Sequence, residues 1–282
     1  MSKIIDGKKL ADTIIESVGN TIKKENLRIG LAVLLIGDNA ASKLYVKLKG
    51  RACHKVGIDF HVYRFPGDSS QTEIIEAIQW LNQDNEIQAI LVQLPLPKHL
   101  DETAIIQAID PKKDVDGFHP DNIKSYLAGE SDFLPGLTRG IQLLLADTKE
   151  NLATKQICIL ANSDEFAEGL EKFFHNQKLQ ATHTHLSEPD WQTKTKKADV
   201  LIVAVGQPWL ITADNIKKDV IIIDVGTNRL PGKKIVGDVD YDDVVDKCSY
   251  ITPVPGGVGP MTIAMLLQNC VYLTQRLLNK NS

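Results

Sequence analysis

Residues 31–39 read LAVLLIGDN, an apolar run that stops at Gly37 and is followed by two polar residues. A short apolar run without alternation is typical of a strand buried on both faces, and glycine with polar residues after it indicates a loop. Residues 40–56 then have helical character, and Gly57 is well placed to end that helix. This strand, loop and helix are the first unit of the pattern from which we predict the fold.

The same alternation continues along the chain. A strand is expected at residues 60–65, a helix at residues 71–82, and a strand at residues 89–94 that Pro95 breaks. The second half adds four strands and one helix, expected at residues 157–160, 181–184, 200–205 and 220–225 and at residues 164–176. Strands that alternate with helices form βαβ units, so we predict parallel sheets.

The fold class predicted from this order is α/β with two lobes. We place the crossover between the lobes in residues 125–140, and we expect an apolar helix at residues 261–278 to return to the first lobe. The first lobe would then consist of residues 1–124 and 260–282. Residues 125–259 would form the second lobe, which is Rossmann-like.

A dense run of proline and glycine precedes the C-terminal helix. Residues 251–262 read ITPVPGGVGPMT, and proline or glycine occupies six of the eight positions 253–260. Proline fixes φ, whereas glycine permits positive φ and lets another group approach the backbone. We expect a rigid loop that belongs to neither a helix nor a central strand. A ligand-binding role is favoured over a turn that merely reverses the chain.

Three further loops are candidates for the same ligand. Ligands of open α/β sheets lie beyond the carboxyl ends of the strands. Polar or Gly/Pro loops follow Leu94, Val205 and Val225. Together with residues 251–262, these loops are expected to line a cleft between the two lobes.

Composition excludes several classes of protein. The chain has 282 residues and a net charge of −4, so nothing indicates a nucleic-acid or anionic-membrane partner. Its four cysteines show no CxxC spacing, which favours a reducing compartment and argues against a zinc site. The N-terminus lacks the apolar core of a signal peptide, and no apolar run reaches the ~18 residues of a membrane span. We expect a cytoplasmic location and no metal.

Five side chains could carry chemistry. Tyr45 and Lys49 are four residues apart and share one helix face, although a solvated amphipathic face would show the same spacing. Gln93 ends an apolar strand and must find hydrogen-bond partners, either in the backbone or beside Lys49. Asp114 and Asp116 precede a glycine. They are either turn carboxylates or a bidentate acceptor for a ring with adjacent N–H groups.

Seven motifs in order resemble the bifunctional methylenetetrahydrofolate dehydrogenase/methenyltetrahydrofolate cyclohydrolase family, often called FolD, over nearly the whole chain. They are SKLYVKLK (42–49), VQLPLP (92–97), PKKDVDGFHPDN (111–122), VAVGQP (203–208), IIDVGTNR (222–229), GDVD (237–240) and ITPVPGGVGPMT (251–262). The resemblance implies oxidation of 5,10-methylenetetrahydrofolate with NADP and hydrolysis of the 5,10-methenyl product to 10-formyltetrahydrofolate. It also implies a place in one-carbon metabolism, which supplies purine, histidine and methionine biosynthesis, and a homodimer.

The resemblance also implies roles for individual residues. Lys49 would be the central catalytic residue and Gln93 would set its protonation state, while Tyr45 would stack on the pterin ring and Asp116 would bind its edge. The folate-binding loop would include Pro255, Gly256 and Gly257. The dinucleotide would contact the loops that hold Ala161, Asn162, Ser163, Val205, Gly206, Gly226 and Thr227. Whether Lys49 acts as a neutral base or as an ammonium stays open.

The chain departs from the family pattern at the dinucleotide end. Where the family has G-R-S-x-x-V-G-x-P, residues 161–169 read ANSDEFAEG, so both glycines and the arginine are replaced. The family's histidine–serine pair aligns with Ser187-Glu188, and a glutamate there would repel a 2′-phosphate. Residues 135–138 read PGLT in place of P-C-T-P, so that cysteine is missing.

These departures leave three readings of the function. The chain could be a bifunctional enzyme, with NAD as an alternative to NADP. It could retain only the cyclohydrolase activity beside a decayed dinucleotide site. A non-catalytic folate-binding relative is the third reading, against which the joint presence of Tyr45, Lys49, Gln93 and Asp116 argues.

Overall fold

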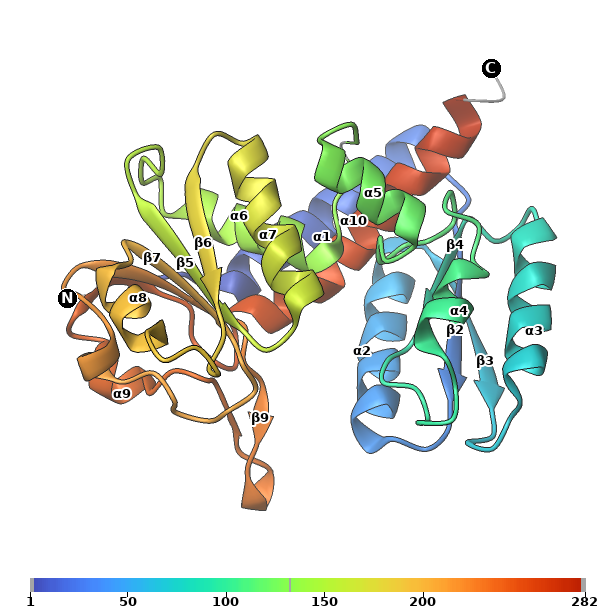
Figure 1. Cartoon of the computed structure of the whole chain (residues 1–282). Coiled ribbons are helices and arrows are strands. Elements are labelled where there is room, and N and C mark those ends of the chain that lie inside the picture. Colours follow the sequence, from blue (N-terminus) through green and yellow to red (C-terminus); the bar gives the residue numbers. More distant parts are fainter. Residues whose placement is uncertain (1–2, 132, 280–282) are drawn as a thin grey trace. The chain divides into compact units, whose positions relative to one another are not determined.

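The computed structural model describes residues 3–131 and 133–279 and divides into two units (Figure 1). One unit consists of Asp12–Gly136 and Ile263–Ser282, and the other of Met1–Ala11 and Leu137–Thr262. The boundaries fall within helix α1 (Gly7–Glu25), after the first residue of helix α6 (Gly136–Asp147), and within helix α10 (Val258–Asn279). The α/β class with parallel sheets is confirmed.

The unit that contains Asp12–Gly136 is built on a three-stranded parallel sheet of order β3-β2-β4. Its strands are β2 (Gly30–Ile36), β3 (Asp59–Phe65) and β4 (Ala89–Val92). Its helices include α2 (Ala40–Val56), α3 (Gln71–Gln83), α4 (Glu102–Gln107) and α5 (Pro120–Ala128). Helices α2 and α3 lie on opposite sides of the sheet (Figure 1).

Local signals explain where helix α2 begins and ends. The side chain of Asn39 accepts hydrogen bonds from the backbone N–H groups of Ala41 and Ser42, which have no partner within the helix. Gly57 has φ of +87°, a left-handed conformation that favours glycine, and it ends the helix. The helix predicted at residues 40–56 is therefore confirmed, and its ends place Tyr45 and Lys49 on consecutive turns.

Strand β2 is buried on both faces, as its apolar sequence predicts. Ala32, Leu34 and Ile36 pack with Ile74 and Ile78 of α3. The residues between them along β2 face the other side of the sheet, because strand side chains alternate. Burial of each large apolar side chain contributes roughly 1.5–3 kcal/mol to folding, so this core fixes the positions of the loops that follow the strands.

The second unit is built on a six-stranded parallel sheet of order β1-β11-β8-β7-β5-β6. The strands are β1 (Lys3–Ile4), β5 (Gln156–Ala161), β6 (Gln180–Thr184), β7 (Val200–Ala204), β8 (Val220–Asp224) and β11 (Cys248–Ile251). The helices are α6 (Gly136–Asp147), α7 (Asp164–Asn176), α8 (Trp191–Lys197) and α9 (Tyr241–Val244), with short 3-10 turns at Ala213–Asn215 and Pro231–Lys233. A small hairpin pairs β9 (Asn228–Arg229) with β10 (Ile235–Val236).

The boundaries of the units differ from those expected from the sequence. The first residues join the second unit, because β1 pairs with β11 and the backbone N–H of Ile5 donates to the carbonyl of Ile251 at 2.9 Å. Residues 125–136 stay with the first unit. Helix α5 continues to Ala128, and the ring of Phe133 stacks on Tyr272 of α10 with centroids 5.4 Å apart.

The expectation that residues 251–262 form neither strand nor helix is wrong at both ends. Strand β11 includes Ile251, and α10 begins at Val258. Pro260 is the third residue of α10, where a backbone N–H would have no acceptor within the helix, so proline is tolerated. The loop proper is therefore shorter than expected.

Among the helices of the described residues, none combines the length and the hydropathy that a bilayer crossing needs.

Candidate active site

Lys49 projects from α2 toward the end of β4. Its Nζ donates a hydrogen bond to Oε1 of Gln93, which directly follows β4, at 3.0 Å. Both side chains are half-buried. Tyr45, also half-buried, lies one turn earlier on the same helix face. The structure thus brings Lys49 and Gln93 together, which settles the open alternative for Gln93 in favour of a position beside Lys49.

Two further contacts fix the orientation of the Gln93 amide. Its Nε2 donates to the carbonyl of Leu94 at 2.8 Å, and the hydroxyl of Ser42 donates to the same carbonyl at 3.3 Å. Because the amide nitrogen is held there, the amide oxygen faces Lys49. Gln93 therefore presents an acceptor, and not a donor, to the ammonium or amine of Lys49.

The two carboxylates at Asp114 and Asp116 have different surroundings. Asp114 accepts hydrogen bonds from the backbone N–H groups of Gly117 and His119 and from the side chain of Asn122. It is therefore a buried turn carboxylate, which was one of the two alternatives for this pair. Asp116 instead interacts electrostatically with Lys49. A bond from the side chain of Asn269 in α10 to the carbonyl of Val115 holds the backbone between them.

Burial shifts the titration of both members of the Lys49–Asp116 pair. Loss of water lowers the pKa of Lys49, and the carboxylate of Asp116 partly opposes this effect. Burial also raises the pKa of Asp116, which the charge of Lys49 partly opposes. A lysine with a lowered pKa reaches its neutral form at a lower pH than a solvated lysine, so it can serve as a base or as an acid.

Two cysteines, which the sequence analysis did not connect with the site, also lie near Lys49. Cys53 is one turn further along α2, and Cys270 is on α10. Burial raises the pKa of Cys53 to about 12 and that of Cys270 well above its ordinary value, so both thiols are neutral. The spacing of four residues from Lys49 could have indicated Cys53, whereas nothing local indicated Cys270.

The strand order of the second unit indicates where that unit could bind a ligand. The order of the strands reverses between β5 and β7, because β6 lies on one side of β5 and β7 on the other. In open α/β sheets, ligands bind at such a reversal, beyond the carboxyl ends of the strands. The loops at this point begin at Ala161 and Val205, and the side chain of Asn162 donates to the carbonyl of Val205 across it.

Two buried carboxylates hold the loops that follow β7 and β8. Oδ2 of Asp238 accepts from the backbone N–H groups of Val205 and Gly206 at 2.6 and 2.9 Å. Asp224 accepts from Gly226 at 2.9 Å and from the backbone of Asp238 at 3.1 Å. Three of the predicted cofactor residues, Val205, Gly206 and Gly226, therefore lie in one hydrogen-bonded network, and Thr227 follows it. Neither aspartate was expected from the sequence to be a site residue.

The loop after β5 is where a Rossmann-type fold binds the phosphates of a dinucleotide, and we call it the phosphate loop. In this chain its side chains make hydrogen bonds within the protein itself. The hydroxyl of Ser163 accepts the backbone N–H of Phe166, which caps α7, and donates to Glu165. Ala161 ends β5 and is fully buried, and its carbonyl lies 2.8 Å from Nδ1 of His185. Of the predicted dinucleotide residues here, Asn162 and Ser163 both have protein partners.

The loop Pro255–Gly257 belongs to the second unit, whereas Lys49, Gln93, Tyr45 and Asp116 belong to the first. Gly256 has φ of +116°, and its carbonyl accepts the backbone N–H of Lys8 at 2.8 Å. The start of α1 therefore supports this loop.

Two models of one protein family together match most of the chain. The model of the tetrahydrofolate dehydrogenase/cyclohydrolase catalytic domain matches residues 5–116, and the model of the NAD(P)-binding domain of the same family matches residues 135–278. The chain belongs to this family. The resemblance that the seven motifs indicate is thereby confirmed.

Relatives match over almost their whole length. The bifunctional protein FolD of Nitratiruptor sp. is 46% identical over 273 residues, which cover 95% of this chain and 96% of that protein. The crystal structure of FolD from Campylobacter jejuni has a TM-score of 0.94 at 41% identity and covers 98% of this chain and 100% of that one. The Trypanosoma brucei FolD, complexed with NADP and an inhibitor, has a TM-score of 0.93 at 29% identity and covers 98% of both chains.

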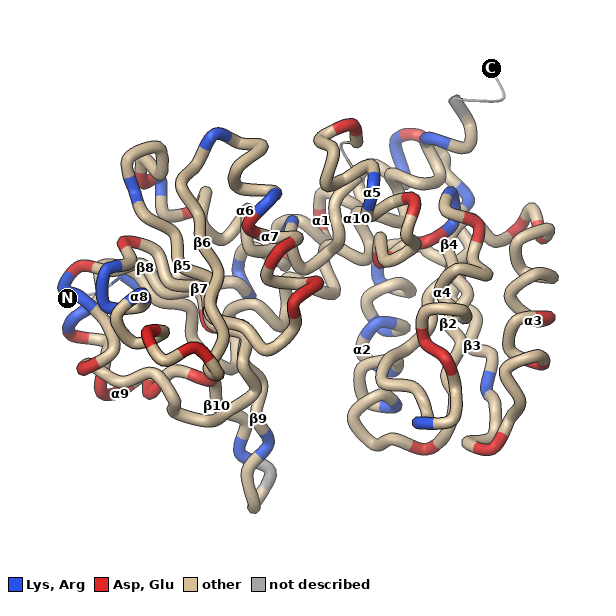
Figure 2. The backbone as a smooth tube through the Cα atoms, viewed as in Figure 1, with Lys and Arg blue, Asp and Glu red and all other residues tan. Residues whose placement is uncertain are grey.

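The family binds NAD(P). In this chain the loops after β7 and β8 suit a bound dinucleotide better than the start of α7 does. Gly206 has φ of +76°, and no described atom lies within 4 Å of the position of an added Cβ, so a ligand can approach its backbone. The start of α7 instead carries Asp164 and Glu165 in its first turn (Figure 2). Carboxylates there oppose an additional bound anion. The loops after β7 and β8 fit a dinucleotide, whereas the start of α7 does not fit an extra phosphate.

Proposed function

We propose that this protein oxidises 5,10-methylenetetrahydrofolate and hydrolyses the 5,10-methenyl product to 10-formyltetrahydrofolate. The arrangement of Lys49, Gln93 and Asp116 supports this function most directly. A bound nicotinamide dinucleotide, which is NADP in the Trypanosoma brucei relative, supplies the hydride acceptor. The function places the protein in one-carbon metabolism, where 10-formyltetrahydrofolate serves purine synthesis.

Lys49 is proposed to move the proton in the hydrolytic step. Water adds to the cationic methenyl carbon and loses a proton, which leaves a hydroxyl on that carbon. This hydroxyl then loses its own proton as the bond from the carbon to N5 breaks and N5 takes up a proton, so the N10-formyl group forms. The lowered pKa of Lys49 makes its neutral amine available to accept the first proton. Gln93, which accepts a hydrogen bond from Nζ, positions Lys49 for this transfer.

The remaining site residues are proposed to bind the folate. Tyr45 offers a half-buried ring on the same helix face as Lys49, which suits stacking on a pterin. Asp116 offers a carboxylate for adjacent N–H groups of the pterin edge. Contacts of the folate with Pro255, Gly256 and Gly257 stay a prediction from the family resemblance.

Lys49→Ala tests the catalytic assignment. We expect hydrolysis of methenyltetrahydrofolate, followed by its absorbance decay, to fall to the uncatalysed rate while the protein stays folded. Lys47→Ala is a matched control, because Lys47 is an exposed lysine on the same helix. Unchanged hydrolysis in Lys49→Ala would sink the assignment. A wild-type protein that binds folate without turnover would instead support a non-catalytic relative.

The acidic start of α7 favours one second candidate, an enzyme that retains only the cyclohydrolase activity. An assay of methylenetetrahydrofolate with NAD and with NADP separates it from the bifunctional enzyme. We further propose a cytoplasmic location, which the four free cysteines support, and a homodimer formed through the second unit. A molar mass of one chain in light scattering would contradict the homodimer.

A further inference from the structure

The adenosine end of the dinucleotide can be located from the fold alone. In Rossmann-type sheets the pyrophosphate lies at the start of the helix after the first strand, and an acidic residue beyond the second strand accepts a hydrogen bond from the ribose 2′-hydroxyl of NAD. Here the first strand is β5, its helix is α7, and the second strand is β6. By this rule, the side chains just beyond Thr184, where β6 ends, are the ones expected to face the adenosine ribose.

Glu188 is the acidic residue at this place. Its Oε1 accepts the backbone N–H of His185 at 2.9 Å. The ring of His185 lies 2.8 Å from the carbonyl of Ala161 through Nδ1 and 3.1 Å from the carboxylate of Asp164 through Nε2. His185 thereby connects the end of β6 with the end of β5 and the first turn of α7, so Glu188 lies beside the phosphate loop.

The charge around Glu188 is negative. Lys194 of α8 pairs with the carboxylate of Glu188 and lies 3.4 Å from that of Asp190, so one ammonium is shared by two carboxylates. The hydrogen bond from Lys194 lowers the pKa of Glu188, which keeps it ionised at neutral pH. Asp164 and Glu165 add two carboxylates at the start of α7. These charges act on the pyrophosphate, which NAD and NADP share, so they weaken the binding of both dinucleotides and only the 2′-phosphate distinguishes the two.

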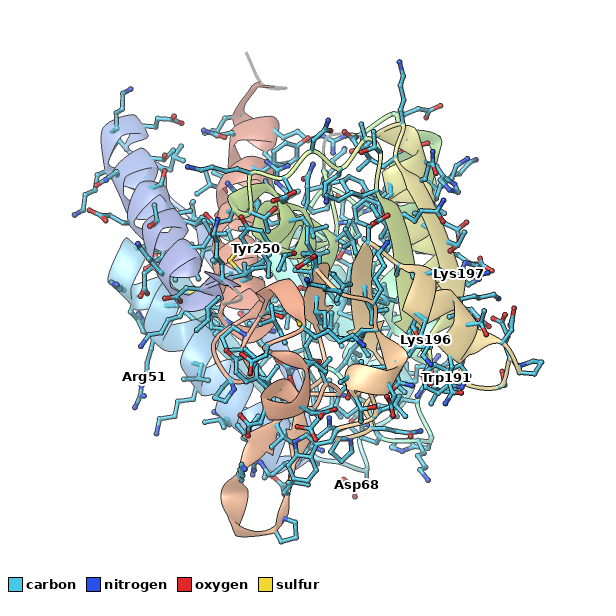
Figure 3. The ribbon with its side chains drawn as sticks, turned by 90° about the vertical axis from the view of Figure 1, so that its left-hand side faces the viewer. Arg51, Asp68, Trp191, Lys196, Lys197 and Tyr250 are labelled. Carbon is cyan, nitrogen blue, oxygen red and sulfur yellow. The ribbon has the colours of Figure 1, made fainter. Side chains whose placement is uncertain are left out.

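The other lysines of α8 do not offset the negative charge around Glu188. Lys196 and Lys197 follow Lys194 on the same helix (Figure 3). Lys196 is two residues on and so lies on a different helix face from Lys194. Lys197 is a turn nearer to Val200, where β7 begins, which is the opposite end of the sheet from the ligand-binding loops.

We propose that this protein binds NAD in preference to NADP and that Glu188 is the residue that selects between them. The carboxylate of Glu188 accepts a hydrogen bond from the free 2′-hydroxyl of NAD. The 2′-phosphate of NADP would bring its own negative charge against the carboxylates of Glu188 and Asp190. This inference rests on the dehydrogenase half of the proposed function and specifies the cofactor of that half.

Lys194 is the group that could otherwise receive a 2′-phosphate. Its ammonium is already bonded to Glu188 and Asp190, so a phosphate would have to displace a carboxylate that stays nearby. Removal of the charge of Glu188 would release Lys194 for the phosphate. A Glu188→Gln variant keeps an oxygen that can accept the N–H of His185, so the local backbone is retained.

The test is equilibrium binding of NADH and NADPH to the full chain, followed by the fluorescence of the nicotinamide. We expect the wild type to bind NADH about tenfold or more tightly than NADPH, and Glu188→Gln to narrow that ratio by about tenfold, as expected for one close charge. Glu188→Ser should act in the same direction. The matched control is Glu150→Gln, which also breaks a Lys–Glu pair, here with Lys155, before the amino end of β5. Its ratio should equal that of the wild type.

Three results would overturn the proposal. Tighter or equal binding of NADPH by the wild type would show that the pocket accepts the 2′-phosphate. If both Glu188 variants kept the wild-type ratio of NADH to NADPH affinity, Glu188 would not be the residue that selects between the dinucleotides. Binding of neither dinucleotide would mean that the pocket has lost the cofactor. Hydrolysis of methenyltetrahydrofolate, measured on the same samples, reports separately on the folate half of the proposed function.

Discussion

The Nζ of Lys49 lies 3.0 Å from Oε1 of Gln93, and the amide nitrogen of Gln93 is held by the carbonyl of Leu94. A neutral acceptor at this distance orients the amine without adding the full charge of a carboxylate. Burial then lowers the pKa of Lys49. The identity of the residue at position 93 should therefore control how easily Lys49 loses its proton.

Gln93→Glu should impair the cyclohydrolase step by raising the pKa of Lys49. A carboxylate so close to Nζ favours the ammonium, and loss of a general base costs on the order of 100-fold or more in rate. The loss should be partly recovered as the pH rises, which a pH–rate profile of methenyl hydrolysis would reveal. Gln83→Glu, an exposed position in the same unit, is the control. An active Gln93→Glu variant with an unshifted profile would show that the titration of Lys49 does not control the rate.

Asp238→Asn should weaken dinucleotide binding and leave the cyclohydrolase step unchanged. Oδ2 of Asp238 accepts two backbone N–H groups, from Val205 and Gly206, and Oδ1 accepts the side chain of Asn228, so an amide in its place leaves donors without an acceptor on one of its two sides. An unsatisfied buried group costs about 1–3 kcal/mol, which corresponds to roughly 10- to 100-fold in affinity if the loop shifts. Titration with NADH measures the loss. Equal losses in NADH binding and in methenyl hydrolysis would point to general unfolding.

Asp224 should make the second unit more stable at pH 5 than at pH 8. Burial raises the pKa of Asp224 from 3.8 to about 7. Between these values the folded state binds more protons than the unfolded state, so the stabilising contribution is complete below pH 3.8 and is lost as the pH rises through 7. From pH 5 to 8 this loss is about 3 kcal/mol.

Urea unfolding of the wild type and Asp224→Asn at both pH values would measure this effect. The variant should be less stable overall, because its NH2 group faces backbone donors, but its stability should depend less on pH. The same dependence on pH in both proteins would assign the effect to other groups.

Sequence patterns predicted the parts of the fold that depend on neighbouring residues. The helix at residues 164–176 has the expected bounds, because Ser163 caps it through the N–H of Phe166. The pairing of β1 with β11 was not predictable, because a strand of two residues carries no periodicity and its partner is far along the chain.

The same distinction holds for the site residues. Lys49 and Tyr45 share a helix face, so their spacing indicates their proximity. Asp238 instead becomes a buried acceptor only once separate loops have been brought together, so it is indistinguishable from other loop aspartates in the sequence. Asp224 falls inside the strand predicted at residues 220–225, but its bond from the backbone N–H of Asp238 could not be predicted, because that residue lies on a separate segment. The approach of Cys270 to Lys49 also depends on the tertiary fold.

Gly7→Ala should destabilise the Pro255–Gly257 loop. A Cβ at Gly7 would lie 2.0 Å from the carbonyl oxygen of Gly257, which is backbone and cannot move aside as a side chain could. Overpacking of this kind costs about 1–3 kcal/mol, and a displaced loop should also weaken folate binding. Gly19→Ala is the control in the same helix, since its Cβ would meet Val56 at an ordinary 3.6 Å and alanine favours helix by up to about 1 kcal/mol. Thermal unfolding and folate titration of both variants test this prediction. A Gly7→Ala protein as stable as Gly19→Ala would show that the Pro255–Gly257 loop can move aside without loss of stability.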